Sequence, residues 1–166
     1  NGGEIYLTTN AVNELLKGVV NNTGIIEANS LDDVTGKVEV YAHGGTANVS
    51  GTINADGGFV ETSGKDLKVA DEFKVKAKTW LLDPTNFTIG TADGGSVTTG
   101  VADGSYIKNT TLETALNSAD VKIQTQSTGS ESGDINVNAN VTWAAKKLTL
   151  EAHGNININA NAISID

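Results

Sequence analysis

The stretch GDINVNAN, residues 133–140, decides the fold, because it recurs as GNININAN at residues 154–161. Six of the eight positions are identical, and the other two exchange Asp for Asn and Val for Ile. The two copies are 21 residues apart. A repeat of this length is typical of solenoids, in which each repeat is one structural unit stacked on the next.

Two further pairs of segments support a repeating architecture. KVEVYAHG at residues 37–44 matches KLTLEAHG at 147–154, and TGIIEAN at 23–29 is echoed by SGTINAD at 50–56. The matched segments share the position of their apolar residues and of the glycine that follows or precedes them. We therefore expect the members of each pair to occupy equivalent places in successive structural units.

Apolar and polar residues alternate in these segments, as at Ile135 and Val137 or at Leu148 and Leu150. This alternation predicts half-buried strands. The runs end at Asn, Gly or Asp, which favour sharp turns. A unit of about 21 residues with three short strands and three turns is one rung of a parallel β-helix. The predicted fold class is all-β, with roughly six to eight rungs.

The expected organisation is a single β-helix segment over residues 1–166. Regular rungs are expected at 1–89 and again at 134–166. Between them, residues 90–133 break the pattern and are predicted to form a decorated rung with a loop and a short helix. Loops on a rigid scaffold often carry function, so this excursion is the best local candidate for recognition.

Two short helical excursions are predicted. One covers residues 110–116, where Thr110 and Glu113 have the spacing of a capping box. The other covers residues 10–17 and ends at Gly18, a residue that commonly stops a helix.

Composition and charge exclude several classes of function. The net charge is -9, and all 11 basic residues are Lys. An acidic chain without Arg is a poor binder of nucleic acid, because that affinity comes from cations on the phosphates. No apolar run approaches the roughly 20 residues that span a bilayer, so no membrane insertion is expected. The absence of Cys removes disulfides, thiolate nucleophiles and Cys-based zinc sites.

The chain resembles the exoproteins of bacterial two-partner secretion, and more narrowly the filamentous-haemagglutinin-like and high-molecular-weight adhesins. The resemblance rests on GGFVETSG at 57–64, on Leu67, and on WLLDP at 80–84. The segments VNNTGIIEA at 20–28 and TTLETAL at 110–116 are also similar to that family. The resemblance covers essentially the whole chain.

The resemblance implies a right-handed parallel β-helix in a Gram-negative virulence protein, displayed as a long fibre at the cell surface. It also implies export through an outer-membrane two-partner-secretion transporter. The secretion domain of that family carries Asn-Pro-Asn motifs, whereas the only proline here, Pro84, follows Asp83. Since the chain also begins without Met and ends in the strand-like run AISID at 162–166, we expect a shaft segment of a longer protein, beyond the secretion domain.

An enzyme is not expected. A polysaccharide lyase would need a carboxylate cluster and a strong base, and this chain has no Arg. Asp32 and Asp33 are the only pair of adjacent aspartates and are interpreted as a solvated turn. His43 and His153 share an Ala-His-Gly context, which predicts equivalent turns rather than a catalytic base.

No metal or cofactor is expected either. Asp-Gly turns at residues 56–58, 93–95 and 103–104 lack the spacing of known calcium repeats. Trp80 and Trp143 are predicted to pack in the core or at its edge rather than to bind a sugar ring. The sequence assigns no ligand-contacting residue.

Asn-x-Ser/Thr sequons occur at five positions, and some adhesins of the resembled family are glycosylated on such asparagines. The five candidate sites are Asn21, Asn48, Asn86, Asn109 and Asn140.

The predicted function is structural and adhesive: a stiff shaft that also offers a surface to a host-cell receptor or glycan. The alternatives are the stalk of a haem-acquisition, contact-dependent inhibition or cytolysin exoprotein, and a polysaccharide-active β-helix enzyme.

Overall fold

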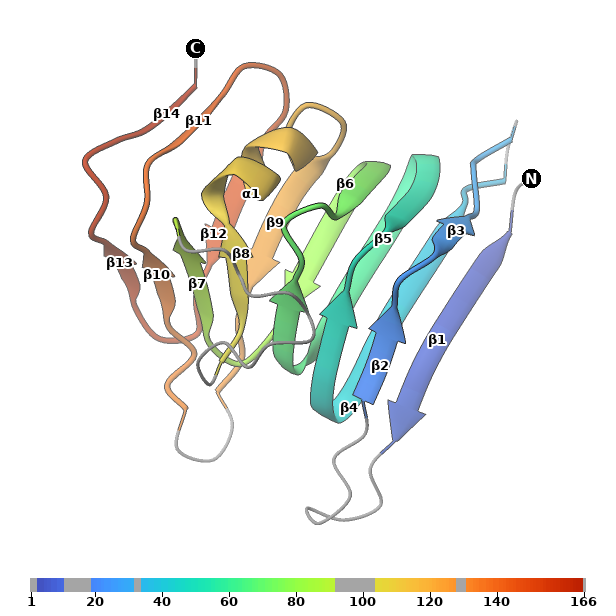
Figure 1. The fold of residues 1–166 in the computed structure, drawn as a ribbon, viewed down its shortest axis with the longest axis horizontal. Helices are drawn as coiled ribbons and strands as arrows, with labels where there is room; N and C mark the ends of the chain where they lie inside the picture. Colours follow the sequence, from blue (N-terminus) through green and yellow to red (C-terminus); the bar gives the residue numbers. More distant parts are fainter. Residues whose placement is uncertain (1–2, 11–18, 32–33, 92–103, 128–130, 166) are drawn as a thin grey trace.

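The computed structural model describes residues 3–10, 19–31, 34–91, 104–127 and 131–165. Within these ranges the chain forms short strands and one helix (Figure 1). The elements are β1 (Glu4–Asn10), β2 (Val19–Asn22), β3 (Ile25–Glu27), β4 (Lys37–Val49), β5 (Thr52–Val69), β6 (Lys74–Asp83), β7 (Phe87–Gly90), β8 (Tyr106–Lys108), α1 (Asn109–Ala115), β9 (Asp120–Gln124), β10 (Ile135–Val137), β11 (Val141–Trp143), β12 (Leu148–Glu151), β13 (Ile156–Ile158) and β14 (Ile163–Ile165).

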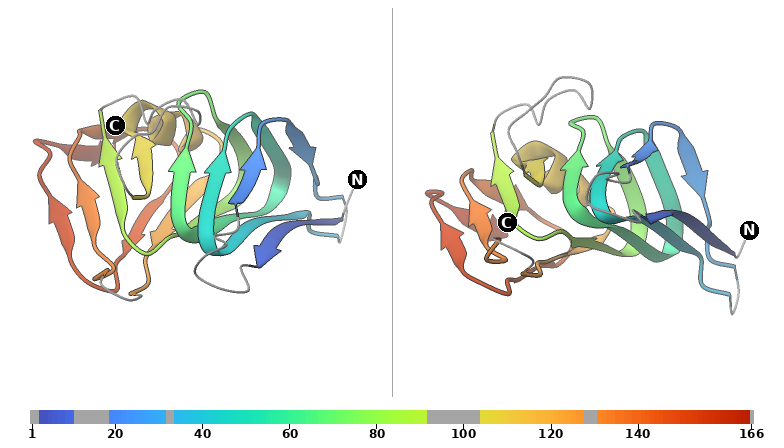
Figure 2. Two further views of the ribbon diagram at one scale, coloured as in Figure 1. Left: turned by 60° about the horizontal axis from the view of Figure 1, so that its bottom comes forward. Right: turned by 90° about the horizontal axis from the view of Figure 1, so that it is seen from below.

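The strands pair in parallel and build a 12-stranded sheet that curves round until it is nearly closed, together with a two-stranded sheet of β11 and β14. Figure 2 shows the curved sheet from two further directions. An all-β chain of parallel strands is therefore confirmed. The recurring stretch behaves as the sequence predicts, because Asn136 of β10 lies in register with Asn157 of β13.

One side of the sheet, here called wall one, consists of β1, the first half of β4, the middle of β5, the end of β6, β9 and β12. Its inward positions form columns in which each residue stacks on its equivalent in the next strand. One such column runs through Ile5, Val38, Val60, Trp80, Val121 and Leu148. The column joins residues of KVEVYAHG and KLTLEAHG, which confirms that these two segments are equivalent.

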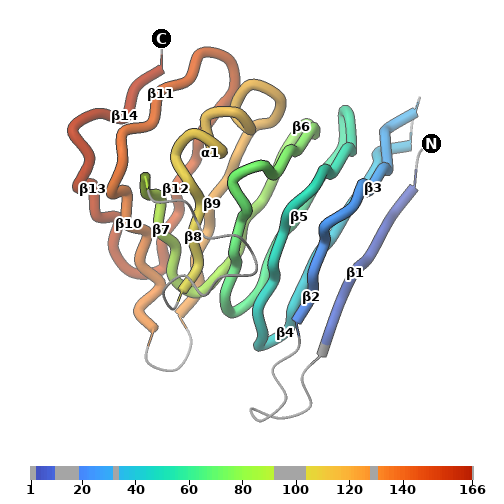
Figure 3. Tube along the Cα trace, viewed as in Figure 1, coloured from blue at the N-terminus to red at the C-terminus, as the bar shows by residue number. Residues whose placement is uncertain are grey.

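A second side, wall two, has the spatial order β2, end of β4, end of β5, β8, β7, β10 and β13. β8 lies between β5 and β7 although it follows β7 in the chain. The chain thus doubles back after β7 and adds a strand inside the stack (Figure 3). The sequence does not predict this insertion.

On the third side, wall three, the parallel strands are interrupted by the helix. β3, the start of β5 and the start of β6 pair in order, whereas β11 and β14 form their own sheet. α1 contacts both β6 and β11 and so takes the place of a strand between them. The Ser118 Oγ donates to the Val75 carbonyl at 2.7 Å on one side, and the Glu113 Oε1 accepts from the Thr142 N–H at 2.9 Å on the other.

α1 confirms the helix predicted over 110–116, but the predicted capping box is wrong. The N-cap residue is Lys108, which has extended backbone angles and makes no side-chain cap hydrogen bond. Glu113 is used instead to satisfy a backbone donor of β11. The helix predicted over 10–17 lies outside the described residues. Among the described residues, no helix is long and apolar enough to cross a membrane.

The walls enclose one apolar core. Trp80 is fully buried, contacts the ring of Phe73 at a centroid distance of 5.2 Å, and thereby confirms its predicted place in the core. Trp143 is partly buried against the same core and donates from its Nε1 to the Lys146 carbonyl. Each large side chain buried in this way contributes about 1.5–3 kcal/mol to folding.

Candidate functional site

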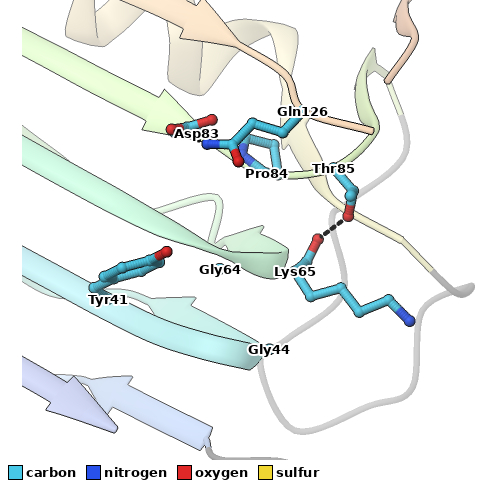
Figure 4. A pocket seen from close by; sticks show the side chains of 8 residues that line it. All are labelled: Tyr41, Gly44, Gly64, Lys65, Asp83, Pro84, Thr85 and Gln126. Atoms are coloured by element: carbon cyan, nitrogen blue, oxygen red, sulfur yellow. Dashed lines mark hydrogen bonds between the residues drawn. The ribbon is translucent and has the colours of Figure 1, made fainter. Parts of the chain in front are cut away.

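A hollow of about 210 Å³ opens on the outer surface at the end of wall one (Figure 4). Tyr41, Ser63 and Asp83 lie in register on three neighbouring strands. Ser63 is small and buried, so the surface sinks between the ring of Tyr41 and the carboxylate of Asp83. The residues that line the hollow are Tyr41, Gly44, Gly64, Lys65, Asp83, Pro84, Thr85 and Gln126.

Gly64 lines the hollow at a position where no side chain would fit. A Cβ at this position would lie 2.8 Å from the Asp66 carbonyl oxygen and 3.1 Å from that of Gly45. Both neighbours are backbone atoms, which cannot move aside cheaply. The rim next to this glycine is held by the Thr85 hydroxyl, which donates to the Lys65 carbonyl at 2.5 Å (Figure 4).

Asp83 is the most distinctive group of the hollow. Its Oδ2 accepts a hydrogen bond from the Gln126 Nε2 at 2.7 Å, whereas its Oδ1 is buried without a hydrogen-bond partner in the described part of the chain. Burial raises the pKa of the Asp83 carboxyl, and the Gln126 hydrogen bond and the nearby charge of Lys122 oppose that rise. A carboxylate beside an amide favours ligands rich in hydroxyl or amine donors.

The other wall of the hollow is aromatic. The rings of Tyr41 and His43 stack with centroids 3.9 Å apart and planes inclined by 46°. His43 therefore lies beside the hollow as a ring partner of Tyr41. Lys65 adds a cation at the rim, with its Nζ 3.7 Å from the Glu131 Oε1.

A second hollow of about 600 Å³ continues along the same corner of the molecule. It shares Gln126 with the first and is lined further along by Glu151 and His153. The two hollows, which meet at Gln126 and have a polar lining with one aromatic wall, are here called the groove. Such a lining offers hydrogen bonds to hydroxyl groups and a flat apolar face to a sugar ring, which are the contacts that carbohydrates use.

Sequence reasoning did not find this groove, although a signal was present. Gly64 closes the GGFVETSG segment, and Asp83 and Pro84 close WLLDP. The two most distinctive segments of the sequence therefore end at the same hollow.

The other predicted candidates are not brought together. Asp32 and Asp33 lie outside the described residues, as do residues 93–95. Within the described ranges, no group of three or more His, Asp or Glu side chains could hold a metal ion.

The five sequon asparagines are held in hydrogen bonds between neighbouring segments. The Asn48 Nδ2 donates to the Asn21 Oδ1 at 2.8 Å, and the Asn109 Nδ2 donates to the Asn140 carbonyl at 2.8 Å. The Asn86 Oδ1 accepts from two backbone N–H groups, those of Gly133 and Asp134, and the Asn140 Oδ1 likewise accepts from those of Asn161 and Ala162. Asn21 and Asn140 are the exposed members of the set.

Comparison with known protein families, with curated proteins and with solved structures gave no match. A function for this chain is therefore inferred from its fold and its surface.

Proposed function

We propose that this chain is a structural and adhesive segment of a secreted bacterial cell-surface exoprotein. In this proposal the chain is a right-handed parallel β-helix that acts as a stiff shaft and presents a binding surface to host-cell glycans. The single observation that carries the proposal is the register of the walls, in which equivalent residues of parallel strands stack in unbroken columns from β1 to β12 and from β2 to β13.

Unbroken columns support the role of a shaft. In walls one and two each inner strand is hydrogen-bonded to a neighbouring strand on both sides, and inward side chains such as Val60 and Leu82 have no exposed surface. A stack in which every layer is bonded to the next resists bending and has no hinge between domains. Such a body is suited to carry a binding region away from a cell surface.

The groove supports the adhesive role. Tyr41 supplies an aromatic face, and Asp83 and Gln126 supply acceptors and donors. Glycan ligands are bound through such combinations of ring stacking and hydrogen bonds to hydroxyl groups. The resemblance of GGFVETSG and WLLDP to two-partner-secretion adhesins supports a surface location and export through the matching outer-membrane transporter. The proposal includes no reaction, cofactor or metal.

The adhesive role is tested by binding of the purified chain to epithelial cells and to an array of host glycans. We expect Tyr41→Ala and Asp83→Asn each to reduce binding by about tenfold, because the first removes the aromatic wall of the hollow and the second removes the negative charge that accepts hydrogen bonds from the ligand. The matched controls are Tyr6→Ala and Asp56→Asn, which change an exposed tyrosine and an exposed aspartate elsewhere. If the first two variants bind as well as the wild type, the groove is not the binding surface. If the wild type binds neither cells nor glycans, the chain is a spacer without an adhesive role.

The shaft role is tested separately by a crystal structure, which fixes the handedness of the coil. A left-handed coil or an isolated barrel that closes on itself would contradict the proposed β-helix.

A further inference from the structure

We propose that the groove binds the interior of an extended chain of uncharged sugars, which crosses the strands of wall one from β4 towards β12, rather than a single terminal sugar. This inference rests on the proposed adhesive function and names the class of glycan that the groove takes.

The groove follows one line of outward positions across wall one. The pairing registers connect five residues on five successive strands, and these are Tyr41, Ser63, Asp83, Gln124 and Glu151. The step from β6 to β9 follows from the pairing of Leu82 with Ile123, because Asp83 and Gln124 are the next residues of those strands. Neighbouring strands lie about 4.8 Å apart, so the steps of this line together cover about 19 Å.

This line is hollowed along its length. Ser63 is small and buried, and Gly64 beside it has no side chain. Gln124 and Glu151 line the second hollow, and Gln126 lines both hollows. Figure 4 shows Gln126 reaching towards the first hollow from its far side. A long ligand can therefore pass from one hollow to the other while it stays on the surface of wall one.

The first hollow alone is too small for a whole glycan ligand. Its volume of about 210 Å³ is below the range of about 300–1,000 Å³ that is usual for ligand pockets, whereas the second hollow, at about 600 Å³, lies within that range. A terminal sugar stacked on Tyr41 would leave the second hollow empty. A linked chain would occupy both, because one pyranose unit of an extended chain is about as long as the spacing between two strands.

The charges at the groove disfavour an anionic glycan. The Lys122 Nζ lies 2.8 Å from the Glu151 Oε2, and the Lys65 Nζ lies 3.7 Å from the Glu131 Oε1, so both ammonium groups are already paired with carboxylates. Asp83, by contrast, is hydrogen-bonded to an uncharged amide. A uronate or a sulfate would bring a further negative charge close to Asp83, and like charges across an interface are unfavourable.

The uncharged groups of the groove match the uncharged groups of a sugar chain. The side-chain amides of Gln124 and Gln126 each offer two N–H donors and one oxygen acceptor. Sugar hydroxyl and acetamido groups also contain both donors and acceptors. Tyr41 supplies a flat ring at one end of the line, where one sugar ring of the chain can stack.

The experiment is isothermal titration calorimetry of the purified chain with two series of oligosaccharides of matched length. The first series is linear N-acetyllactosamine with one to four repeats, which is uncharged. The second is hyaluronan, which carries a carboxylate on every other sugar. We expect the affinity for N-acetyllactosamine to rise by at least about tenfold from one repeat to three, because the added rings contact the second hollow. We expect hyaluronan of the same length to bind at least about tenfold more weakly.

Two variants test the part of the groove that lies beyond the Tyr41 hollow. Gln124→Ala should weaken binding of the three-repeat oligomer by about fivefold and leave binding of the single repeat unchanged. Glu151→Gln leaves Lys122 without its carboxylate partner and should therefore reduce the preference for the uncharged series. Thr88→Ala, at a partly exposed position of β7 on wall two, is the control and should bind both series like the wild type. The midpoint of thermal unfolding shows that each variant is folded.

The outcomes separate this inference from the adhesive function on which it rests. Affinity that does not depend on chain length, hyaluronan that binds as tightly as N-acetyllactosamine, or a Gln124→Ala variant that loses both oligomers equally would each overturn the inference and leave the adhesive function standing. If neither series binds and the wild type also binds no other glycan, both are wrong.

Discussion

Trp80 and Thr62 meet inside the core, where the indole Nε1 donates to the threonine Oγ1 at 2.9 Å and neither side chain has exposed surface. The bond joins two neighbouring strands of wall one. It explains how a large aromatic side chain with a polar group is accommodated among aliphatic columns.

Thr62→Val should therefore destabilise the fold by about 1–3 kcal/mol, because the buried indole N–H loses its acceptor. Urea denaturation followed by tryptophan fluorescence measures this loss. Trp80→Phe removes the donor, and in the double variant the cost of Thr62→Val should nearly disappear. Additive costs would show that the hydrogen bond contributes nothing to stability.

The turn before β5 depends on a glycine. Gly51 has a φ of +70°, and a Cβ there would lie 2.3 Å from the Gly24 carbonyl oxygen. Gly51→Ala should cost at least about 2 kcal/mol, because it adds backbone strain to a steric clash. Gly44→Ala, which has φ +64° but open space around the Cβ, should cost about 1 kcal/mol. Gly24→Ala meets no atom within 4 Å and is the control in the same denaturation experiment.

The helix in wall three gives a local prediction. Glu113 accepts from the Thr142 N–H and is one of the groups that join α1 to β11. Glu113→Ala should speed hydrogen exchange at the Thr142 amide and lower the unfolding free energy by about 1 kcal/mol. Glu72→Ala, at an exposed position, is the control. Unchanged exchange at Thr142 would contradict the assigned role of Glu113.

The sequence predicts the regular parts of this fold well, and the reason is local. In β10 and β13 the apolar alternation and the flanking Gly and Asn recur together, so that register follows from the pattern. The pairing of Ile26 with Ile53 follows in the same way from the weaker match of TGIIEAN with SGTINAD. Inward residues stack on the inward residues of the neighbouring strand. The turns determine which residue of each strand is the first to point inward.

The parts that the sequence does not predict depend on non-local order. β8 has only three residues, and nothing in Tyr106–Lys108 indicates that it inserts before β7 rather than after it. The helical pattern around Leu112 predicts a helix, but not that it replaces a strand. The hollow at Asp83 was missed because its walls come from four segments that only the folded register brings together.

The fold also ranks four of the five sequons. Asn48 and Asn109 use their Nδ2, the atom that N-glycosylation modifies, as a hydrogen-bond donor to another segment. Asn21 and Asn140 are exposed and engage through their Oδ1. If the chain is exposed to a glycosyltransferase, we expect sugar at Asn21 and Asn140 before Asn48 and Asn109. Mass spectrometry of tryptic peptides measures site occupancy, and preferential modification of Asn48 or Asn109 would contradict the ranking.

Asp83 makes the stability of the fold depend on pH in a direction opposite to that of most carboxylates. Its pKa is raised above the ordinary value of 3.8 by burial, so the folded state binds this proton more tightly than the unfolded state. The contribution of Asp83 to stability is therefore largest at low pH and falls as the pH rises from 3.8 through the raised pKa. Asp56 and Asp134 have lowered pKa values, caused chiefly by Lys76 and by the Asn155 N–H respectively, and contribute with the opposite sign.

Comparing the wild type with Asp83→Asn isolates the contribution of Asp83, because the other carboxylates cancel. The amide retains an oxygen acceptor for the Gln126 Nε2 and carries no charge to bury. The variant should have almost the same stability as the wild type near pH 3 and should become the more stable of the two as the pH rises towards 7. Urea denaturation at a series of pH values gives this difference directly. A difference that stays constant with pH, or that favours the wild type at neutral pH, would show that the carboxylate is not penalised by burial in the hollow.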